Sequence, residues 1–337
     1  MIRRTRPLRT VALLLFTLFL AAAEPAPTPR ATFSVNSPGD VGDGDAGDGL
    51  CDTGPPGEPT GVCTLRAAID EANALPDADV ITFSVGTDRT TIPTFGYVVT
   101  QPLTIDGTSH PGWEPYGPPV VELTSDGTPG TGLSIFGSDV VVDGLAITGF
   151  SQYGIRISGN RVQIRGSHVG ITSEGLVLGN GASGIYVDGA VETEIGHEVG
   201  AEGVPANVIS GNGGDGIELW DAQDAVVKRN FIGVDRTATT AVPNDGHGVN
   251  VNGGIGNRIG GEGPGEPPPF AWYAANVISG NGKDGVIIQG DADETIVVEN
   301  RIGTGDSDDV AIGNTDDGVS LVNVSGSLVG QLPPWGG

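Results

Sequence analysis

The sequence has few aromatic residues, which make up 5% of its 337 residues, and 57 of the residues are glycine. A conventional large domain fills its core with bulky side chains, so this composition argues against one. A solenoid avoids the shortage because each coil buries small aliphatic side chains against its neighbours. The sequence also lacks apolar residues at helical spacing outside one short segment. The composition therefore indicates a repetitive structure built of strands.

Basic residues are scarce as well: the lysines are Lys228 and Lys283 alone, and the formal net charge is -26. Removing the four arginines within residues 1–23 changes this charge to -30. Such an acidic surface repels nucleic acid and anionic lipid heads, so we expect neither as a partner. It favours cations and solubility.

Residues 1–23 combine a basic start, an apolar run from Val11 and a small-residue end, which together predict a secretory signal peptide. A membrane anchor is the weaker alternative because the apolar run is short for a bilayer span, and no span is expected after cleavage. Residues 24–31, EPAPTPRA, predict a linker. We therefore expect a secreted or cell-surface protein.

Cysteine is almost absent, and an exported chain whose cysteines are Cys51 and Cys63 most simply forms one disulfide between them. A structural zinc site is the poorer interpretation, because two thiolates are too few ligands and no histidine lies nearby.

A repeat occupies most of the chain: NVISGNGGDGIEL at residues 207–219 recurs as NVISGNGKDGVII at residues 276–288. Both contain an anchor glycine followed by β-type alternation of apolar residues. The anchors are Gly132, Gly154, Gly184, Gly216, Gly248, Gly285 and Gly318. A second anchor, an apolar residue before glycine, follows at Gly170, Gly196, Gly233, Gly260, Gly303 and Gly330. The distance between the two anchors alternates between 16–18 and 12 residues, which predicts alternating long and short coils.

One segment, residues 63–74, has apolar residues at helical spacing and predicts an amphipathic helix, with a strand at residues 80–85 directly after it. Placed before the first coil, such a helix can cover the open end of a solenoid. We therefore divide the mature chain into residues 32–79, an acidic Gly-rich loop with the capping helix, and residues 80–337, the coils. After Gly330 only QLPPWGG remains, so the array is predicted to end before its next coil.

CTLRAAIDEAN, which begins at Cys63, resembles the CSLREA motif of secreted bacterial repeat proteins. Thr64 stands in place of the serine of that motif, and Ala67 in place of its glutamate. The coils resemble the repeats of the pectate-lyase-like superfamily. The resemblance implies an all-β fold, a right-handed parallel β-helix with a short N-terminal amphipathic capping helix, and an export route. It implies little about activity, because β-helices carry many functions.

An acidic loop precedes the predicted helix. Its carboxylates, separated largely by glycine, are a candidate calcium site because calcium takes several carboxylate oxygens on a backbone that can curl. The candidate ligands are Asp40, Asp43, Asp45, Asp48 and Asp52. The spacing is not that of an EF-hand, and a flexible acidic loop without metal is the alternative.

Asparagine stands four residues before five of the anchor glycines, which predicts a structural ladder of amides along the solenoid. Its members are Asn180, Asn212, Asn244, Asn281 and Asn314. The residues directly before these glycines form a broken acidic column, a second candidate place for calcium: Ser183, Asp215, His247, Asp284 and Asp317. His247 occupies a slot that aspartate or serine holds elsewhere.

A polysaccharide lyase needs a base, often arginine or lysine in this superfamily, and the weak candidates are Arg165, Arg229 and Arg301, which share a place near the second anchor. Solvated ion pairs are the alternative. Two Pro-rich segments carry Trp113, Tyr116, Trp272 and Tyr273, whose rings either stack on sugars or cover apolar coil surface.

Together these features predict a secreted or cell-surface β-helix protein with a non-catalytic carbohydrate-binding, adhesion or structural role, and a polysaccharide or cell-surface glycan as partner. The alternative is a calcium-dependent polysaccharide lyase or a glycoside hydrolase that acts on acidic polysaccharide. Calcium is the one cofactor we expect, and the sequence does not determine the oligomeric state.

Overall fold

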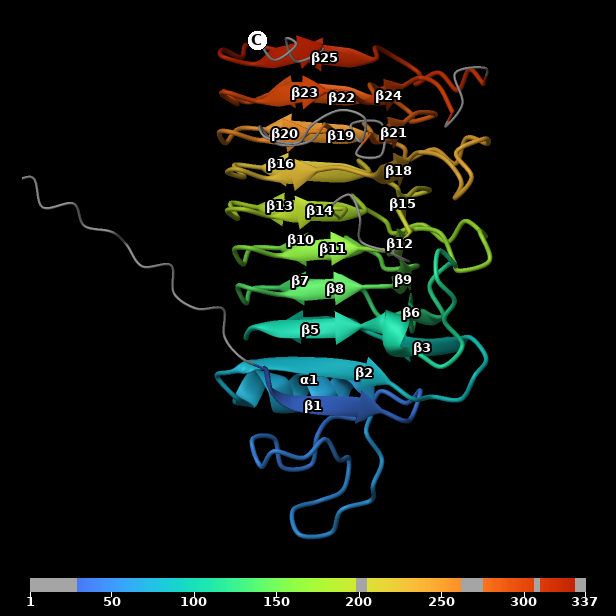
Figure 1. Cartoon of the computed structure of the whole chain (residues 1–337), viewed down its shortest axis with the longest axis vertical. Helices are drawn as coiled ribbons and strands as arrows, with labels where there is room; N and C mark the ends of the chain where they lie inside the picture. Colours follow the sequence, from blue (N-terminus) through green and yellow to red (C-terminus); the bar gives the residue numbers. More distant parts are fainter. Residues whose placement is uncertain (1–28, 198–204, 262–274, 306–309, 331–337) are drawn as a thin grey trace, which may run out of the picture.

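The computed structural model describes residues 29–197, 205–261, 275–305 and 310–330. In this part of the chain, short strands stack into coils that rise along one axis, as Figure 1 shows. Each complete coil contributes one strand to each of three parallel sheets, of 10, 8 and 8 strands. The predicted all-β solenoid is confirmed. Residues 1–28 and 331–337, which hold the predicted signal peptide, most of the linker and the end of the array, lie outside the described residues.

Sheet A contains β1 Pro29–Val35, β2 Ala78–Phe83, β5 Leu103–Asp106, β8 Val141–Asp143, β11 Gln163–Arg165, β14 Glu194–Ile195, β17 Val226–Val227, β20 Arg258–Ile259, β23 Ile296–Val298 and β26 Leu328–Gly330. Sheet B contains β3 Thr90–Thr94, β6 Val121–Ser125, β9 Leu145–Thr148, β12 His168–Val169, β15 Asn207–Ile209, β18 Asn230–Ile232, β21 Val277–Ile278 and β24 Arg301–Ile302. Sheet C contains β4 Tyr97–Val99, β7 Leu133–Ile135, β10 Ile155–Ile157, β13 Ile185–Asp188, β16 Ile217–Trp220, β19 Val249–Asn252, β22 Val286–Gln289 and β25 Val319–Leu321. One 3₁₀ turn, η1 Gly107–Ser109, follows β5.

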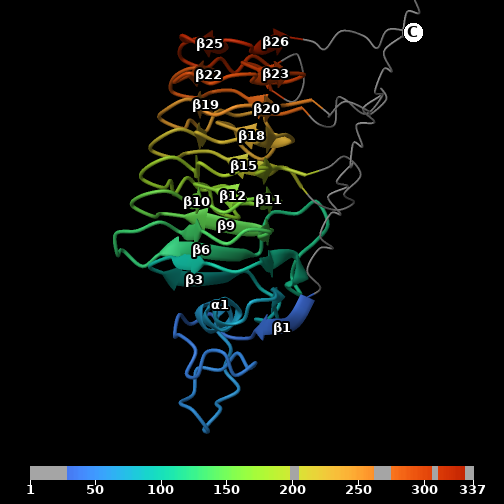
Figure 2. The same cartoon turned by 90° about the vertical axis from the view of Figure 1, so that its left-hand side faces the viewer.

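The core runs through the middle of the stack, between sheets that lie on different sides of it. Figure 2 shows β19, β22 and β25 of sheet C on one side and β20, β23 and β26 of sheet A on the other. Neighbouring coils align the same kind of residue, so that Ile155 pairs with Ile185 and Ile185 with Ile217, all fully buried. Aliphatic columns of this kind replace the aromatic core that the composition excludes.

The asparagines four residues before the anchor glycines form one buried hydrogen-bonded column. Each side-chain amide donates to the carbonyl oxygen of the next, as from Asn212 to Asn244 at 2.9 Å and from Asn244 to Asn281 at 3.0 Å. The column explains the anchor glycine: a Cβ on Gly216 would lie 2.9 Å from the amide nitrogen of Asn244 and 2.7 Å from the carbonyl oxygen of Gly248. A side chain larger than hydrogen does not fit there.

A second asparagine column, which the sequence analysis missed, lies at the corner between sheets A and B. Asn207 donates to Asn230 at 2.8 Å, Asn230 to Asn276 at 2.9 Å and Asn276 to Asn300 at 2.8 Å. All four side-chain amides also donate to backbone carbonyl oxygens of the preceding coil. Buried amides that are satisfied in this way stabilise the corner.

The predicted alternation of long and short coils is wrong: the sheet C strands that begin at Ile185, Ile217, Val249, Val286 and Val319 follow one another at 32, 32, 37 and 33 residues. Gly170, Gly233 and Gly303 follow strands of sheet B, whereas Gly196, Gly260 and Gly330 lie at the ends of strands of sheet A. Both corners require a left-handed backbone, for example φ 91° at Gly170 and φ 119° at Gly196, so glycine appears at both. The glycines that the sequence analysis grouped as the second anchor therefore occupy two different corners of the coil. What alternates is the corner at which the chain forms a longer loop. Hairpin-like loops follow the sheet B strands β12, β18 and β24.

The helix α1 Leu65–Ala74 packs against β1, β2 and β4 at the amino-terminal end of the stack. It starts two residues later than predicted because Thr64 has extended backbone and caps the helix, its hydroxyl accepting from the Ala67 amide at 3.1 Å. β2 lies two residues earlier than the predicted strand. β1 begins at Pro29, inside the predicted linker, because it pairs in parallel with β2.

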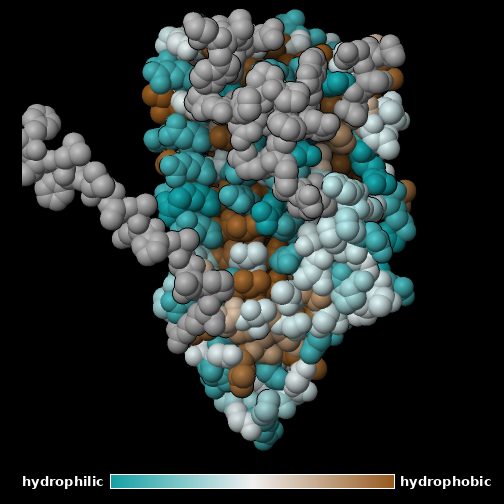
Figure 3. Space-filling model, in the orientation of Figure 1, coloured by the Kyte–Doolittle hydropathy of each residue, from teal (hydrophilic) through white to brown (hydrophobic). Residues whose placement is uncertain are grey.

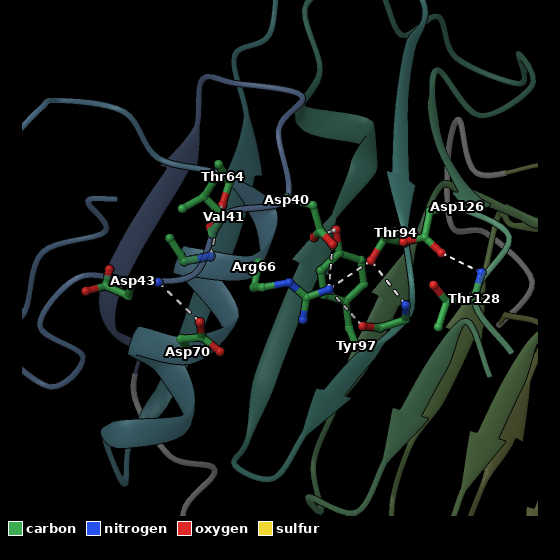
Figure 4. A network of polar contacts seen from close by, with 12 residues as sticks. Asp40, Val41, Asp43, Thr64, Arg66, Asp70, Thr94, Tyr97, Asp126 and Thr128 are labelled. Atoms are coloured by element: carbon green, nitrogen blue, oxygen red, sulfur yellow. Dashed lines mark hydrogen bonds and ion pairs between the residues drawn. The ribbon is translucent and has the colours of Figure 1, made fainter. Parts of the chain in front are cut away.

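Arg66 ties this helix to the first coil, as Figure 4 shows. Its Nη2 donates to Asp40 at 2.7 Å, to the Thr94 hydroxyl at 2.9 Å and to the Gly96 carbonyl at 3.0 Å. The guanidinium also lies 3.9 Å from the centroid of the Phe95 ring. These contacts of one end of the guanidinium hold the cap in one orientation.

Candidate functional site

The outward side chains of sheet C form a continuous surface, which we call the sheet C face. On β16, Ile217 and Leu219 are fully buried while Glu218 and Trp220 alternate with them and point outward. Parallel register aligns one column of Arg156, Tyr186, Glu218 and Asn250, and a second of Asp188, Trp220, Asn252 and Gln289. A third column, directly before the anchor glycines, contains Tyr153, Ser183, Asp215, His247, Asp284 and Asp317.

Two tyrosines form an aromatic platform on this face. The rings of Tyr153 and Tyr186 stack with 4.6 Å between their centroids and 14° between their planes. Beside them, Arg156 donates to Asp188 at 2.6 Å, and this ion pair is half-exposed. Trp220, the neighbour of Asp188 in its column, is 42% exposed. Half-buried tyrosine rings next to an exposed tryptophan on a rigid sheet are suited to contact with planar or sugar ligands.

The charges around the platform keep its hydroxyls protonated. Burial raises the pKa of Tyr186 to about 12, and the carboxylate of Asp188 adds to this effect. Burial also raises the pKa of Tyr153, and Glu218 adds to it. Both phenols are therefore hydrogen-bond donors at neutral pH.

Glu218 and Asp215 are two carboxyl groups with different surroundings. The Ser183 hydroxyl donates to Glu218 at 2.7 Å, but burial raises the pKa of Glu218, and the charge of Asp215 adds to it. Asp215 instead accepts from the backbone amide of His247 at 2.6 Å and from the side chain of Asn250 at 2.8 Å. Asn250 pairs directly with Glu218 in register, so both carboxyl groups lie on the same part of the face.

Polar contacts continue along the third column toward the carboxyl-terminal coils. His247 Nδ1 lies 3.2 Å from a carboxylate oxygen of Asp284, and the other oxygen of Asp284 accepts from the Asp317 amide at 2.9 Å. The column that the sequence analysis assigned to calcium is thus linked by protein hydrogen bonds. Among the described residues, no group of three or more His, Cys, Asp or Glu side chains is arranged to hold a metal ion.

Most carboxylates of the acidic loop accept hydrogen bonds from other groups of the protein. Asp40 accepts from Arg66 and from the Tyr97 hydroxyl, and Asp43 accepts from the amides of Asp45 and Asp52. Hydrogen bonds from Thr60 hold the pKa of Asp52 at about 2. Asp48 accepts from Leu50, and Asp45 is exposed. The structure does not gather these five side chains into one cluster. Cys51 and Cys63, which flank this loop region, form the expected disulfide.

The three candidate arginines occupy different positions. Arg165 lies on β11 and donates to Asp143 at 2.8 Å on the outer side of sheet A, Arg229 lies between β17 and β18, and Arg301 begins β24 in sheet B. They do not share a column, so the common face that their place near the second anchor predicted is not formed. Beside Arg165, a cavity of ≈ 360 Å³ opens on sheet A, lined by Asp139, Val141, Arg161, Gln163, Glu192 and Glu194.

Of the predicted stacking residues, Trp113 is half-buried and Tyr116 is 63% exposed on the loop before β6. Trp272 and Tyr273 lie outside the described residues. The tyrosine platform of the sheet C face was missed, although a sequence pattern points to it: Arg156, Tyr186, Glu218 and Asn250 each stand second after an anchor glycine.

Hydrophilic side chains line much of the stack on the face that Figure 3 shows, with hydrophobic ones in the middle of that face. No helix among the described residues is long and apolar enough to cross a membrane.

No protein-family model matches the chain, and no curated protein matches it. Among solved structures, it is similar to the A-module of the Azotobacter vinelandii mannuronan C-5 epimerase AlgE4, with a TM-score of 0.51 and 15% identity over 79% of this chain and 71% of that one. The fold is a right-handed parallel β-helix. A second similar structure, pectate lyase Pel9A, has a TM-score of 0.38 and 16% identity over 89% of this chain and 79% of that one. At these identities the likeness of the β-helix to the epimerase module shows the fold alone.

Proposed function

We propose that this β-helix is an exported, non-catalytic protein that binds a polysaccharide along the sheet C face. The stacked pair of Tyr153 and Tyr186 carries the proposal, because half-buried aromatic rings beside hydrogen-bonding side chains are what a sugar ring contacts. The structural neighbour named above is an enzyme that acts on the polysaccharide mannuronan, which agrees with a glycan ligand for this fold.

Several further properties belong to the same proposal. Export through residues 1–23 agrees with the disulfide of Cys51 and Cys63, since disulfides persist in oxidising compartments. Membership of the CSLREA-motif group rests on the sequence of residues 63–73. A role for calcium rests on the acidic character of residues 40–52, and a chelator tests it.

The test is retention of the mature protein on a panel of immobilised plant, algal and bacterial polysaccharides, with calcium or with a chelator. Tyr186→Ala should abolish retention on the polysaccharide that binds best. Tyr116→Ala is the matched control, since it removes an exposed tyrosine from a loop away from this face. Retention lost with Tyr116→Ala and kept with Tyr186→Ala would place binding on the loop and overturn the proposal.

Glycoside hydrolysis is a second candidate, favoured by one observation. Glu218 has a raised pKa, as a general acid needs, and lies beside a second carboxyl group, Asp215, which accepts hydrogen bonds from His247 and Asn250. New reducing ends from any polysaccharide of the panel, lost in Glu218→Gln, would establish this activity. Unsaturated products, detected by their ultraviolet absorbance, would instead indicate a lyase.

A further inference from the structure

Resting on the glycan site proposed above, we infer that its ligand carries protonated amino groups, as a hexosamine polymer with free amines does. The inference concerns the charge and the aromatic surroundings of Glu218 on the sheet C face. It differs from the acidic polysaccharide that the sequence alone suggested.

The charges of the sheet C face do not suit an anionic glycan. Carboxylates of Asp188, Asp215, Glu218, Asp284 and Asp317 lie in its columns, and the guanidinium of Arg156 is already paired with Asp188 at 2.6 Å. Lys283 is exposed on a turn two coils beyond Glu218, and His247 lies against Asp284. A uronate chain along this face would meet mainly like charges, whereas an ammonium group would be attracted.

Glu218 and Asp215 accept their hydrogen bonds from uncharged groups. Their hydrogen-bond donors are the neutral Ser183 hydroxyl, the Asn250 amide and the His247 backbone. Half-burial without a neighbouring cation raises the pKa of Glu218, which a bound ammonium group would lower again.

Aromatic rings surround the same position. Tyr186 is the partner of Glu218 on the preceding coil, and Trp220 stands two residues after it on the same outward side of β16. An ammonium group near Glu218 would lie close to these rings as well as to the carboxylate, and cations are attracted to both. A sugar that stacks on the platform brings its substituents to this place.

The test compares three oligosaccharides of equal length by titration calorimetry at mildly acidic pH: a glucosamine oligomer, its N-acetylated form and a galacturonate oligomer. The glucosamine oligomer should bind at least about tenfold more tightly than the N-acetylated one, the effect of one charge-assisted hydrogen bond, and the galacturonate oligomer most weakly. Glu218→Gln should remove most of the preference for the amine, so that the glucosamine oligomer and its N-acetylated form bind with similar affinity.

A highly acidic protein also attracts polycations without a site, so Asp88→Asn is the matched control. It removes one exposed negative charge from the loop before β3. Equal losses in Glu218→Gln and Asp88→Asn would mean non-specific attraction and overturn the inference. Equal or stronger binding of the N-acetylated or galacturonate oligomer would overturn it too, while the glycan site itself would stand. If none of the three oligomers, nor any polysaccharide of the panel, bound the protein, the proposed function would fail as well.

Discussion

The ring of Tyr153 lies face to face with the ring of Tyr186, which comes from the next coil, and 4.6 Å separates the two centroids. Neither residue belongs to the conserved-looking part of the repeat, yet the register of the coils brings them together. They lie on the sheet C face, where the outward side chains differ from one coil to the next.

The first prediction concerns the ionisation of Tyr186. Because burial and then Asp188 raise its pKa to about 12 from the ordinary 10.0, its absorbance change on ionisation should have a midpoint near pH 12. Unfolding releases this proton more readily, so the contribution of Tyr186 to stability is complete below pH 10 and is lost as pH rises toward 12. The titration of wild type minus Tyr186→Phe gives the midpoint. A difference curve centred near pH 10 would show that the surroundings of Tyr186 are not as described.

A second prediction concerns the buried amide column. Asn244 is fully buried, donates to Asn281 and Ile209, and accepts from Asn212. Asn244→Ala leaves these partners unsatisfied, and we expect a loss of about 3 kcal/mol in the free energy of unfolding, measured with urea. Asn252→Ala, which removes a half-buried amide from the sheet C face, should cost less than about 0.5 kcal/mol. Similar losses in the two variants would show that the column adds little to stability.

A third prediction concerns the cap. Arg66 and Asp40 are a largely buried ion pair, with side chains 15% and 17% exposed. Arg66→Ala leaves Asp40 buried without its partner, so α1 should lose about 3 kcal/mol of protection from amide hydrogen exchange. The control is Arg161→Ala, whose partner Asp139 is exposed and whose loss should cost less than about 1 kcal/mol. Unchanged exchange in α1 would contradict the role of Arg66.

The fourth prediction concerns acid unfolding. Burial lowers the pKa of His168 from 6.5 to about 4. Its neutral form therefore contributes stability that is complete above pH 6.5 and is lost as pH falls toward 4, by about 3 kcal/mol in all. Unfolding free energies measured across this range should fall more steeply in wild type than in His168→Leu. Parallel curves would mean that His168 titrates alike in the folded and unfolded chain.

The sequence predicts those parts of the fold whose residues recur at fixed places in the repeat. The anchor glycines and the amide column at Asn180 to Asn314 could be predicted because each recurs at a fixed place in the repeat, the asparagine before five of the seven glycines. The second column, which begins at Asn207, could have been predicted in part, since Asn207, Asn230 and Asn276 each stand directly before apolar residues of a sheet B strand. This column was not predicted because the glycines at two different corners were treated as one anchor position.

The sheet C face was harder to predict, because it depends on contacts between coils. Tyr153 and Tyr186 are 33 positions apart, and Glu218 follows Tyr186 by 32. Anchor spacings that range from 22 to 37 residues hide which side chains are neighbours. The calcium ligands predicted in the acidic loop were inferred from composition alone. Composition does not show that backbone amides donate hydrogen bonds to the carboxylates of Asp43 and Asp52.

The most direct test of the glycan site is a crystal structure of the protein with the oligosaccharide that binds best. Sugar rings on Tyr153 and Tyr186, with a substituent within hydrogen-bond distance of Glu218, are the predicted result. Sugar density in the cavity of sheet A or on the Trp113 loop, with the sheet C face empty, would contradict it.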